Sequence, residues 1–108
     1  MSIDIVIVNW NAGIQLKTCI DSIIAYGGNL VDKIIVVDNG SVDGSEASVE
    51  DYPQVTLIRA GENLGFGKAC NLGARHAESE FLLFLNPDAA LYPDTLSKVV
   101  AFMKHPEN

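Results

Sequence analysis

Cysteines, basic residues and long apolar runs are all scarce in this chain. Its two cysteines, Cys19 and Cys70, stand alone without a C-x-x-C motif. This disfavours a disulfide or metal framework and favours two reduced, packed thiols. Seven basic residues against 14 acidic ones give a net charge of -7, which argues against a nucleic-acid or anionic-membrane surface. No run approaches membrane-spanning length, and Met1–Asp4 lacks the basic start of a signal peptide.

These scarcities predict a cytoplasmic protein that binds no nucleic acid. A full-length form could also lie peripherally at the inner face of the membrane. The composition is globular, with 48% hydrophobic and 19% charged residues. A chain of 108 residues fits one domain, 1–108. Such a domain buries about two-thirds of its unfolded surface, so a real core is expected.

Four short apolar runs, rich in Ile, Val and Phe, have the composition of β-strands. They are Ile3–Val8, Lys33–Asp38, Val55–Ile58 and Phe81–Leu85. Three of them are nearly continuous rather than alternating, which is typical of strands buried on both faces of a parallel sheet.

Helical patterns lie between these runs. The predicted helices cover about residues 13–26, a short stretch after Ser45, 66–76 and 93–104. An apolar stripe that starts at Leu16 supports the first, and Gly27-Gly28 ends it. The Ser45 hydroxyl is expected to cap the second, and Pro93 to lie in the first turn of the last. The alternation predicts an α/β fold, a parallel sheet with helices on both faces.

Polar residues follow each predicted strand. They are Asn9-Trp10-Asn11, Asp38-Asn39-Gly40-Ser41, Gly61-Glu62-Asn63 and Asn86-Pro87-Asp88. The carboxyl ends of parallel strands share one edge of the sheet, and open α/β sheets bind ligands there. We therefore expect Asn9, Asp38 and Asp88 to converge around one cleft.

Asp38 begins the most oxygen-rich stretch, "VVDNGSVDGS". Its carboxylate only accepts hydrogen bonds, which suits a nucleobase imide N–H or a ribose hydroxyl. The alternative is that Asp38 merely caps a turn, since Asn39-Gly40 and Asp43-Gly44 are strong turn dipeptides. A calcium loop is excluded, because its spacing needs glycine at position 43.

The stretch "NLGFGKACNLGA" places Gly65 and Gly67 where a loop enters a helix. Glycine permits close approach of a ligand to the backbone, and a helix N-terminus offers free N–H groups. Lys68 lies in the first helical turn, where a phosphate contact is possible. Neither G-x-G-x-x-G nor the P-loop pattern fits, so a tight structural loop remains the alternative.

The third motif, "FLNPDA", carries Asp88 just beyond the fourth strand. An oxygen donor there suits Mg²⁺ or Mn²⁺, which often take one or two carboxylates together with substrate phosphates. Such a cation would carry a diphosphate into an acidic protein. The alternative is that Asp88 caps a turn. Arg59 is expected on the surface, and Trp10 either packs over the first crossover or lines the nucleotide pocket.

Taken together, "VNWN", "VVDNGSVDGS", "NLGFGKACNLGA" and "FLNPDA" resemble the family 2 glycosyltransferases in order and spacing. The resemblance spans Val8 to Ala89 and implies a GT-A fold with a Rossmann-like nucleotide-binding half. It implies roles for Asn9 and Asn11 beside the nucleotide, for Asp38 at the base, for Asn63 and Gly67 in the pocket, and for Asn86 and Asp88 at the D-x-D position. Asn86 replaces the first aspartate of that motif, which leaves Asp88 as the carboxylate that would bind the metal. Lys68 is included among the nucleotide-sugar-binding residues because it lies in the first turn of the helix that follows the glycine-rich loop.

The resemblance also implies inverting transfer of a sugar from a UDP or dTDP donor to a saccharide or lipid-linked acceptor. The "NPDA" form and "NWN" look most like the rhamnosyltransferase branch, with dTDP-rhamnose as donor. The family's catalytic base lies downstream, so none is assigned here. We expect the chain to be the donor-binding N-terminal part of a longer enzyme, inactive alone and prone to self-association.

Two alternatives stay open at this point. A non-catalytic nucleotide-sugar-binding module would share every one of these features. A flavodoxin-like receiver or flavin domain shares the alternating pattern, but receivers need acidic residues after the first strand, where Asn9 and Asn11 are uncharged.

Overall fold

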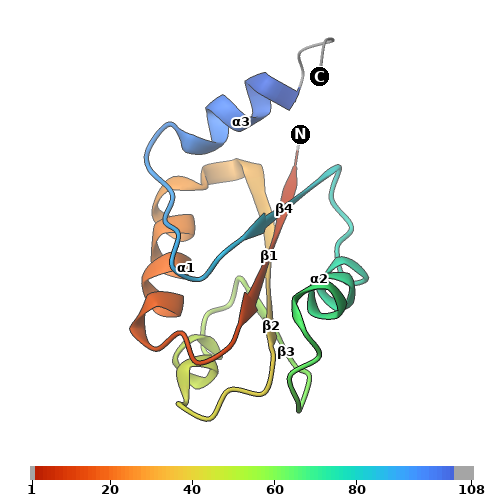
Figure 1. Cartoon of the computed structure of the whole chain (residues 1–108). Coiled ribbons are helices and arrows are strands. Elements are labelled where there is room, and N and C mark those ends of the chain that lie inside the picture. Colours follow the sequence, from red (N-terminus) through yellow and green to blue (C-terminus); the bar gives the residue numbers. More distant parts are fainter. Residues whose placement is uncertain (1, 104–108) are drawn as a thin grey trace.

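A four-stranded parallel sheet forms the centre of the computed structural model, which describes residues 2–103 (Figure 1). Its strands are β1 (Ile3–Asn9), β2 (Val31–Asp38), β3 (Val55–Arg59) and β4 (Phe81–Leu85), in the order β3-β2-β1-β4. All three pairings are parallel. The register sets Asn9 opposite Asp38, and Ile7 opposite Leu85. The predicted parallel α/β sheet is confirmed.

Helices cover both faces of this sheet, as predicted. The α-helices are α1 (Ile14–Tyr26), α2 (Phe66–Ala74) and α3 (Thr95–Met103), and the short 3-10 helices are η1 (Gly28–Leu30) and η2 (Ser45–Val49). Figure 1 shows α2 on one side of the strands and α1 and η2 on the other. Leu96 of α3 packs into the core on the α1 side.

Two apolar layers result from the alternation of side chains along the strands. Ile3, Ile5 and Ile7 of β1 pack with α1, whereas Val6 packs with Ala69 of α2. Because β1 and β2 are covered from both sides, their apolar residues lie in consecutive buried positions. The edge strand β4 is less covered, and Phe84 keeps 45% of its surface exposed.

A buried carboxylate ties the amino ends of the strands together. Asp4 accepts hydrogen bonds from the N–H groups of Lys33 (3.1 Å), Glu78 (2.7 Å) and Ser79 (3.0 Å), and from the Ser79 hydroxyl (2.7 Å). Burial raises the pKa of Asp4, but these four hydrogen bonds outweigh burial and hold that pKa below its ordinary value. The charged form is therefore the one that holds this end of the sheet.

Three predicted details were wrong. Ser45 is not an N-cap: Gly44 precedes η2 with φ 78°, and the Ser45 hydroxyl donates instead to Asp43 Oδ1 (2.6 Å). The third predicted helix ends at Ala74, because the next turn tightens into i, i+3 hydrogen bonds. The last begins at Thr95 rather than Pro93, because Thr95 Oγ1 accepts from Tyr92 N–H (2.9 Å) in a turn before the helix. Its predicted end at residue 104 lies outside the described residues.

Both cysteines are free, as predicted; Cys19 is buried and Cys70 half-buried. Between residues 2 and 103, no helix has both the length and the apolar character that crossing a bilayer requires.

Candidate nucleotide-binding site

Asn9 and Asp38 meet at the carboxyl edge of the sheet, as predicted. Asn9 is fully buried, and its Nδ2 lies 3.0 Å from Asp38 Oδ1, 3.2 Å from Ser41 Oγ and 2.8 Å from Ser45 Oγ. The other Asp38 oxygen, Oδ2, accepts from the Ser41 N–H at 3.0 Å. Asp38 therefore does cap the turn that follows β2, and only 3% of its surface remains open.

A reciprocal pair of side chains, which we call the loop clasp, joins the segment after β1 to the segment after β2. Asn11 Oδ1 accepts from the Val42 N–H at 2.8 Å, and Asp43 Oδ2 accepts from the Gly13 N–H at 3.0 Å. Hydrogen bonds from the Ser45 hydroxyl and N–H hold the pKa of Asp43 below its ordinary value. Each loop thus satisfies backbone donors of the other, and Asn11 serves the framework through its side chain.

Asn39 connects the β2 end to the loop after β3. It is 3% exposed; its Oδ1 accepts from the Leu64 N–H (2.9 Å), and its Nδ2 donates to Asn63 Oδ1 (3.1 Å). Asn63 Oδ1 also accepts from the Gly65 N–H at 2.8 Å. The predicted pocket residue Asn63 is therefore exposed but has its carbonyl engaged in shaping its own loop.

The loop then enters α2 with Gly65 at φ 85°. Gly67 and Lys68 lie in the first turn, as predicted, and both are exposed. A Cβ added at Gly67 would meet no atom within 4 Å, so open space adjoins the backbone there. The helix N-terminus, with its unpaired N–H groups, is accessible to a ligand.

The segment Asn86–Asp88 follows β4 beside the end of β1. The Asn86 carbonyl accepts from the Ala89 N–H (3.0 Å) and lies 3.8 Å from Cys19 Sγ of α1. Burial, together with the negative charge of Asp88, raises the pKa of Cys19 to about 11. The segment thus rests against α1, with the side chains of Asn86 and Asp88 exposed.

Within residues 2–103, the hydrogen bonds link Asn9, Asn11 and Asp38 into one network, but none joins that network to Asn86 or Asp88. Nor does any group of three or more His, Cys, Asp or Glu side chains gather as a metal site in this part of the chain. Asp88 offers one exposed carboxylate, and Asn86, two residues before it, offers an exposed amide. This donor set fits Mg²⁺ or Mn²⁺ only if a ligand's phosphates supply the remaining oxygens.

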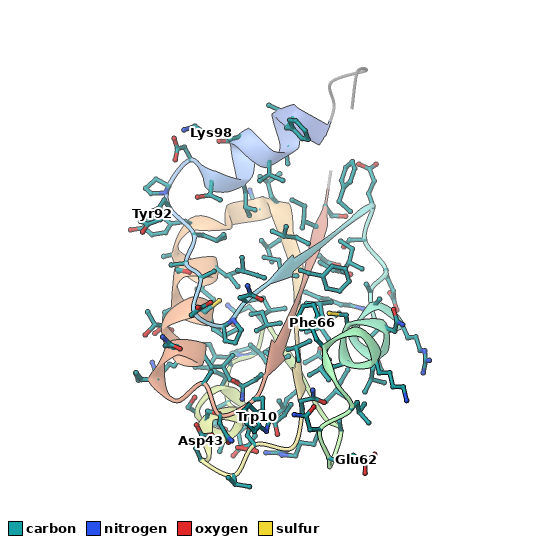
Figure 2. All side chains as sticks on the ribbon, in the orientation of Figure 1. Trp10, Asp43, Glu62, Phe66, Tyr92 and Lys98 are labelled. Atoms are coloured by element: carbon teal, nitrogen blue, oxygen red, sulfur yellow. The ribbon has the colours of Figure 1, made fainter. Side chains whose placement is uncertain are left out.

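Two further predictions have clear outcomes. Arg59 pairs with Glu50 at 2.8 Å on the surface, as expected. Trp10 exposes 56% of its surface and so is not packed away over the crossover. Figure 2 shows Trp10 and Asp43 at the same lower end of the molecule, with Glu62 nearby across that end.

The framework residues Asn39, Ser41 and Ser45 were missed as site residues from the sequence. Asn39 and Ser45 are buried polar residues, and Ser41 is half-buried. The signal that could have found them is the surplus of short polar side chains beyond what two turn dipeptides need.

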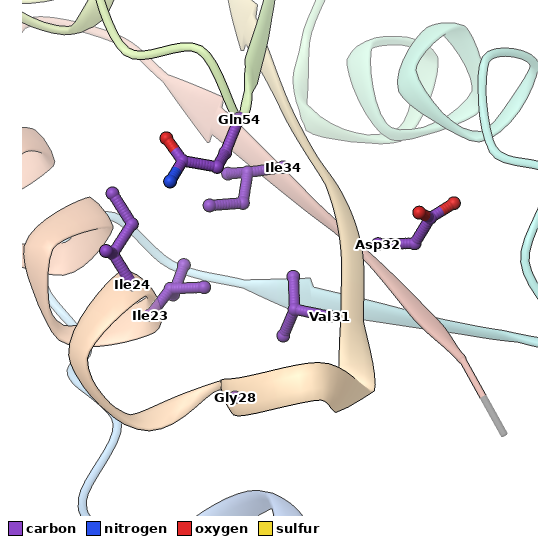
Figure 3. A pocket seen from close by; sticks show the side chains of 7 residues that line it. All are labelled: Ile23, Ile24, Gly28, Val31, Asp32, Ile34 and Gln54. Atoms are coloured by element: carbon purple, nitrogen blue, oxygen red, sulfur yellow. The ribbon is translucent and has the colours of Figure 1, made fainter.

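A small cavity of about 90 Å³ lies at the opposite, amino edge of the sheet (Figure 3). It is lined by Ile23, Ile24, Gly28, Val31, Asp32, Ile34 and Gln54. Ligand pockets ordinarily hold about 300 Å³ or more. The cavity is thus too small for a nucleotide and is remote from the polar edge.

A parallel α/β sheet with polar loops gathered at its carboxyl edge is of the open-sheet class that binds ligands there. More specifically, the chain belongs to glycosyl transferase family 2, whose family model matches residues 4–108. This family membership rules out the alternative of a flavodoxin-like receiver or flavin domain. Among solved structures, the Pyrobaculum calidifontis mannosyltransferase PcManGT in complex with GDP-Man and Mn²⁺ superposes with a TM-score of 0.86 at 26% identity, over 96% of this chain and 32% of that one.

S. aureus TarS in complex with UDP-GlcNAc gives a TM-score of 0.83 at 25% identity, over 95% of this chain and 31% of that one. The fold is accordingly that of a part of the GT-A glycosyltransferases. Among curated proteins, the uncharacterized glycosyltransferase YibD of Escherichia coli is 30% identical over 95 residues, covering 84% of this chain and 27% of that protein.

An N-acetylglucosaminyl-diphospho-decaprenol L-rhamnosyltransferase of Mycobacterium tuberculosis is 32% identical over 79 residues, which cover 62% of this chain and 26% of that protein. The chain thus spans about a quarter to a third of the length of these proteins.

Proposed function

We propose that this chain binds a UDP- or dTDP-linked sugar at the carboxyl edge of its sheet, as the donor-binding part of a glycosyltransferase. The observation that carries the proposal is the buried network around Asp38, which fixes a carboxylate where three polar loops meet. The two solved structures with bound nucleotide sugars support it, because both share this fold over nearly the whole chain.

The nucleoside would lie against Asp38 and Trp10. Asp38 keeps 3% of its surface exposed, and its carboxylate would accept a hydrogen bond from the base imide or a ribose hydroxyl. The exposed ring of Trp10 offers a face on which a base can stack. Asn9 and Asn11 support this region from below, and Asn63 shapes the loop that borders it.

The diphosphate would lie at the N-terminus of α2. The open space at Gly67 lets phosphate oxygens approach the backbone N–H groups, and the exposed Lys68 adds a positive charge. Both features matter because the chain carries a net charge of -7. Asp88, with Asn86 beside it, would hold Mg²⁺ or Mn²⁺, which would offset charge on the departing diphosphate.

The reaction served by this site would be inverting transfer to a saccharide or lipid-linked acceptor. Similarity to a rhamnosyltransferase and the "NPDA" motif favour dTDP-rhamnose as the donor. The proposal assigns no catalytic base within residues 1–108. This chain alone is therefore expected to bind donor and to transfer no sugar.

Calorimetric titration with UDP and dTDP, with and without Mn²⁺, tests the proposal. We expect binding at millimolar concentrations or tighter. Asp38→Ala should weaken binding about tenfold at any Mn²⁺ concentration, the loss of one hydrogen bond to a charged group. Asp88→Ala should remove the gain that Mn²⁺ provides.

Asp32→Ala is the matched control, because it removes one exposed carboxylate at the opposite end of the sheet. It reports the effect of net charge alone and should leave binding nearly unchanged. Absence of binding by either nucleotide at millimolar levels, or equal affinities for wild type, Asp38→Ala and Asp88→Ala, would refute the site.

A further inference from the structure

The Asn9 side chain lies beneath the candidate site rather than in it. Asn9 is fully buried, whereas Asp38, which it contacts, retains 3% of its surface. Asn9 has no exposed surface, so a ligand at the carboxyl edge cannot contact its amide, whereas Asp38 keeps a small exposed part. Any influence of Asn9 on a ligand must pass through the groups that the amide holds.

The chemistry of its neighbours fixes the orientation of this amide. A carboxylate only accepts hydrogen bonds, so Nδ2 and not Oδ1 must face Asp38 Oδ1 at 3.0 Å. Two N–H groups face three oxygens, and the shortest contacts are to Ser45 Oγ (2.8 Å) and Asp38 Oδ1. Ser45 accepts there, because its own hydroxyl donates to Asp43 at 2.6 Å.

This orientation leaves Asn9 Oδ1 buried with no hydrogen-bond partner. An unpaired buried carbonyl lowers the stability of the fold, and such groups are rare in native proteins. An asparagine that served only the stability of the fold would be expected to have both of its side-chain polar atoms paired. The cost is explained if the amide N–H has a task at Asp38.

We propose that Asn9 is a positioning residue for nucleoside binding: it holds the Asp38 carboxylate in the orientation that a ligand requires. This inference rests on the proposed nucleotide site. Asn9 Nδ2 fixes Oδ1 and the Ser41 N–H fixes Oδ2, so the carboxylate is held at both oxygens before a ligand arrives. A group oriented in advance loses less entropy on binding, which strengthens affinity.

The test compares UDP with pyrophosphate, both in the presence of Mn²⁺, on the 108-residue chain carrying Asn9→Ala, Asp38→Ala or both substitutions. Asn9→Ala should weaken UDP about tenfold and leave pyrophosphate unchanged. Added to Asp38→Ala, it should cause no further loss, because its effect acts through that carboxylate. A purely structural role would weaken both ligands and would add to the loss from Asp38→Ala.

Ser79→Ala is the folding control, since it removes a hydrogen bond to a buried side chain at the opposite edge of the sheet. It should leave UDP and pyrophosphate binding unchanged under conditions where all variants are folded. Hydrogen exchange supplies a readout without ligand: Asn9→Ala should accelerate exchange of the Ser41 amide, which donates to Asp38, and Ser79→Ala should not.

The outcomes separate the two proposals. Failure of UDP to bind, or an Asp38→Ala variant that binds normally, refutes the nucleotide site; the Ser41 exchange rate then still decides whether Asn9 holds Asp38. An Asp38→Ala effect without an Asn9→Ala effect overturns the positioning role alone. The positioning role is also overturned if the losses in UDP affinity from Asn9→Ala and Asp38→Ala multiply in the double variant, or if Asn9→Ala leaves the exchange of the Ser41 amide unchanged.

Discussion

Two glycines of α2, Gly67 and Gly73, should respond in opposite ways to replacement by alanine. Neither has a positive φ, so an alanine meets no backbone strain at either position. They differ in surroundings: Gly67 is exposed in the first turn, and Gly73 is buried against the sheet. The pair therefore separates helix propensity from packing within one helix.

The expected magnitudes follow from the space around each glycine. At Gly67 an added Cβ meets nothing within 4 Å, so Gly67→Ala should stabilise the fold by about 0.5 kcal/mol through helix propensity and reduced unfolded-state entropy. At Gly73 the added Cβ would lie 2.5 Å from Val6 Cγ1 and 3.1 Å from Val37 Cγ2. Overpacking of this kind costs about 1–3 kcal/mol.

Urea unfolding monitored by circular dichroism measures both changes, and equal m-values would confirm that the unfolding transition is comparable. For a domain of this size, 1 kcal/mol corresponds to a shift in Tm of about 4–8 °C. A UDP titration adds the functional half of the prediction. Gly67→Ala should weaken UDP despite its gain in stability, because the methyl group fills the space through which phosphate would approach.

Two results would refute this reasoning at different points. A Gly73→Ala variant as stable as wild type would show that α2 does not pack against Val6 as closely as described. A Gly67→Ala variant that gains stability but binds UDP normally would remove the α2 N-terminus from the diphosphate site.

Three other predictions concern polar and sulfur groups. Asp4→Asn should cost about 2–3 kcal/mol, since an amide cannot accept all the hydrogen bonds that the carboxylate accepts. Because the folded pKa of Asp4 is lowered, its contribution to stability is present above about pH 4 and is lost as pH falls through the folded pKa. The acid limb of a pH–stability curve should therefore flatten in this variant. In native protein at pH 8 a thiol reagent should modify Cys70 and spare Cys19, which is buried and has a pKa of about 11; mass spectrometry of the labelled peptides checks this, and rapid labelling of Cys19 would contradict its burial. Asp43→Ala should accelerate hydrogen exchange of the Gly13 amide, and unchanged exchange would mean that the loop clasp does not hold in solution.

The strands could be predicted from the sequence because a run of apolar residues, which is a local feature, determines each of them. Ile34 to Val37 are consecutive apolar residues, and only a strand covered on both faces buries such a run. The meeting of Asn9 and Asp38 also followed from sequence, since both end parallel strands and so share an edge. Their roles as ligand contacts stay predictions.

The site's internal hydrogen bonds could not be predicted in this way. Ser45 has the properties of an N-cap, but its hydroxyl donates to Asp43 and accepts from Asn9, a partner 36 positions away. Asn39 bridges to Asn63 only because the end of β2 and the loop after β3 are adjacent. Such choices depend on partners that the fold brings together, and no local preference records them.

The loop clasp makes two sequence positions interdependent. Asn11 accepts from the N–H of Val42, next to Asp43, and Asp43 accepts from the N–H of Gly13, two residues after Asn11. The loss of either side chain therefore removes a contact that orders the other loop. Substitutions at these two positions should therefore be inherited as pairs among relatives, and a homologue that has abandoned one partner should have rebuilt both turns.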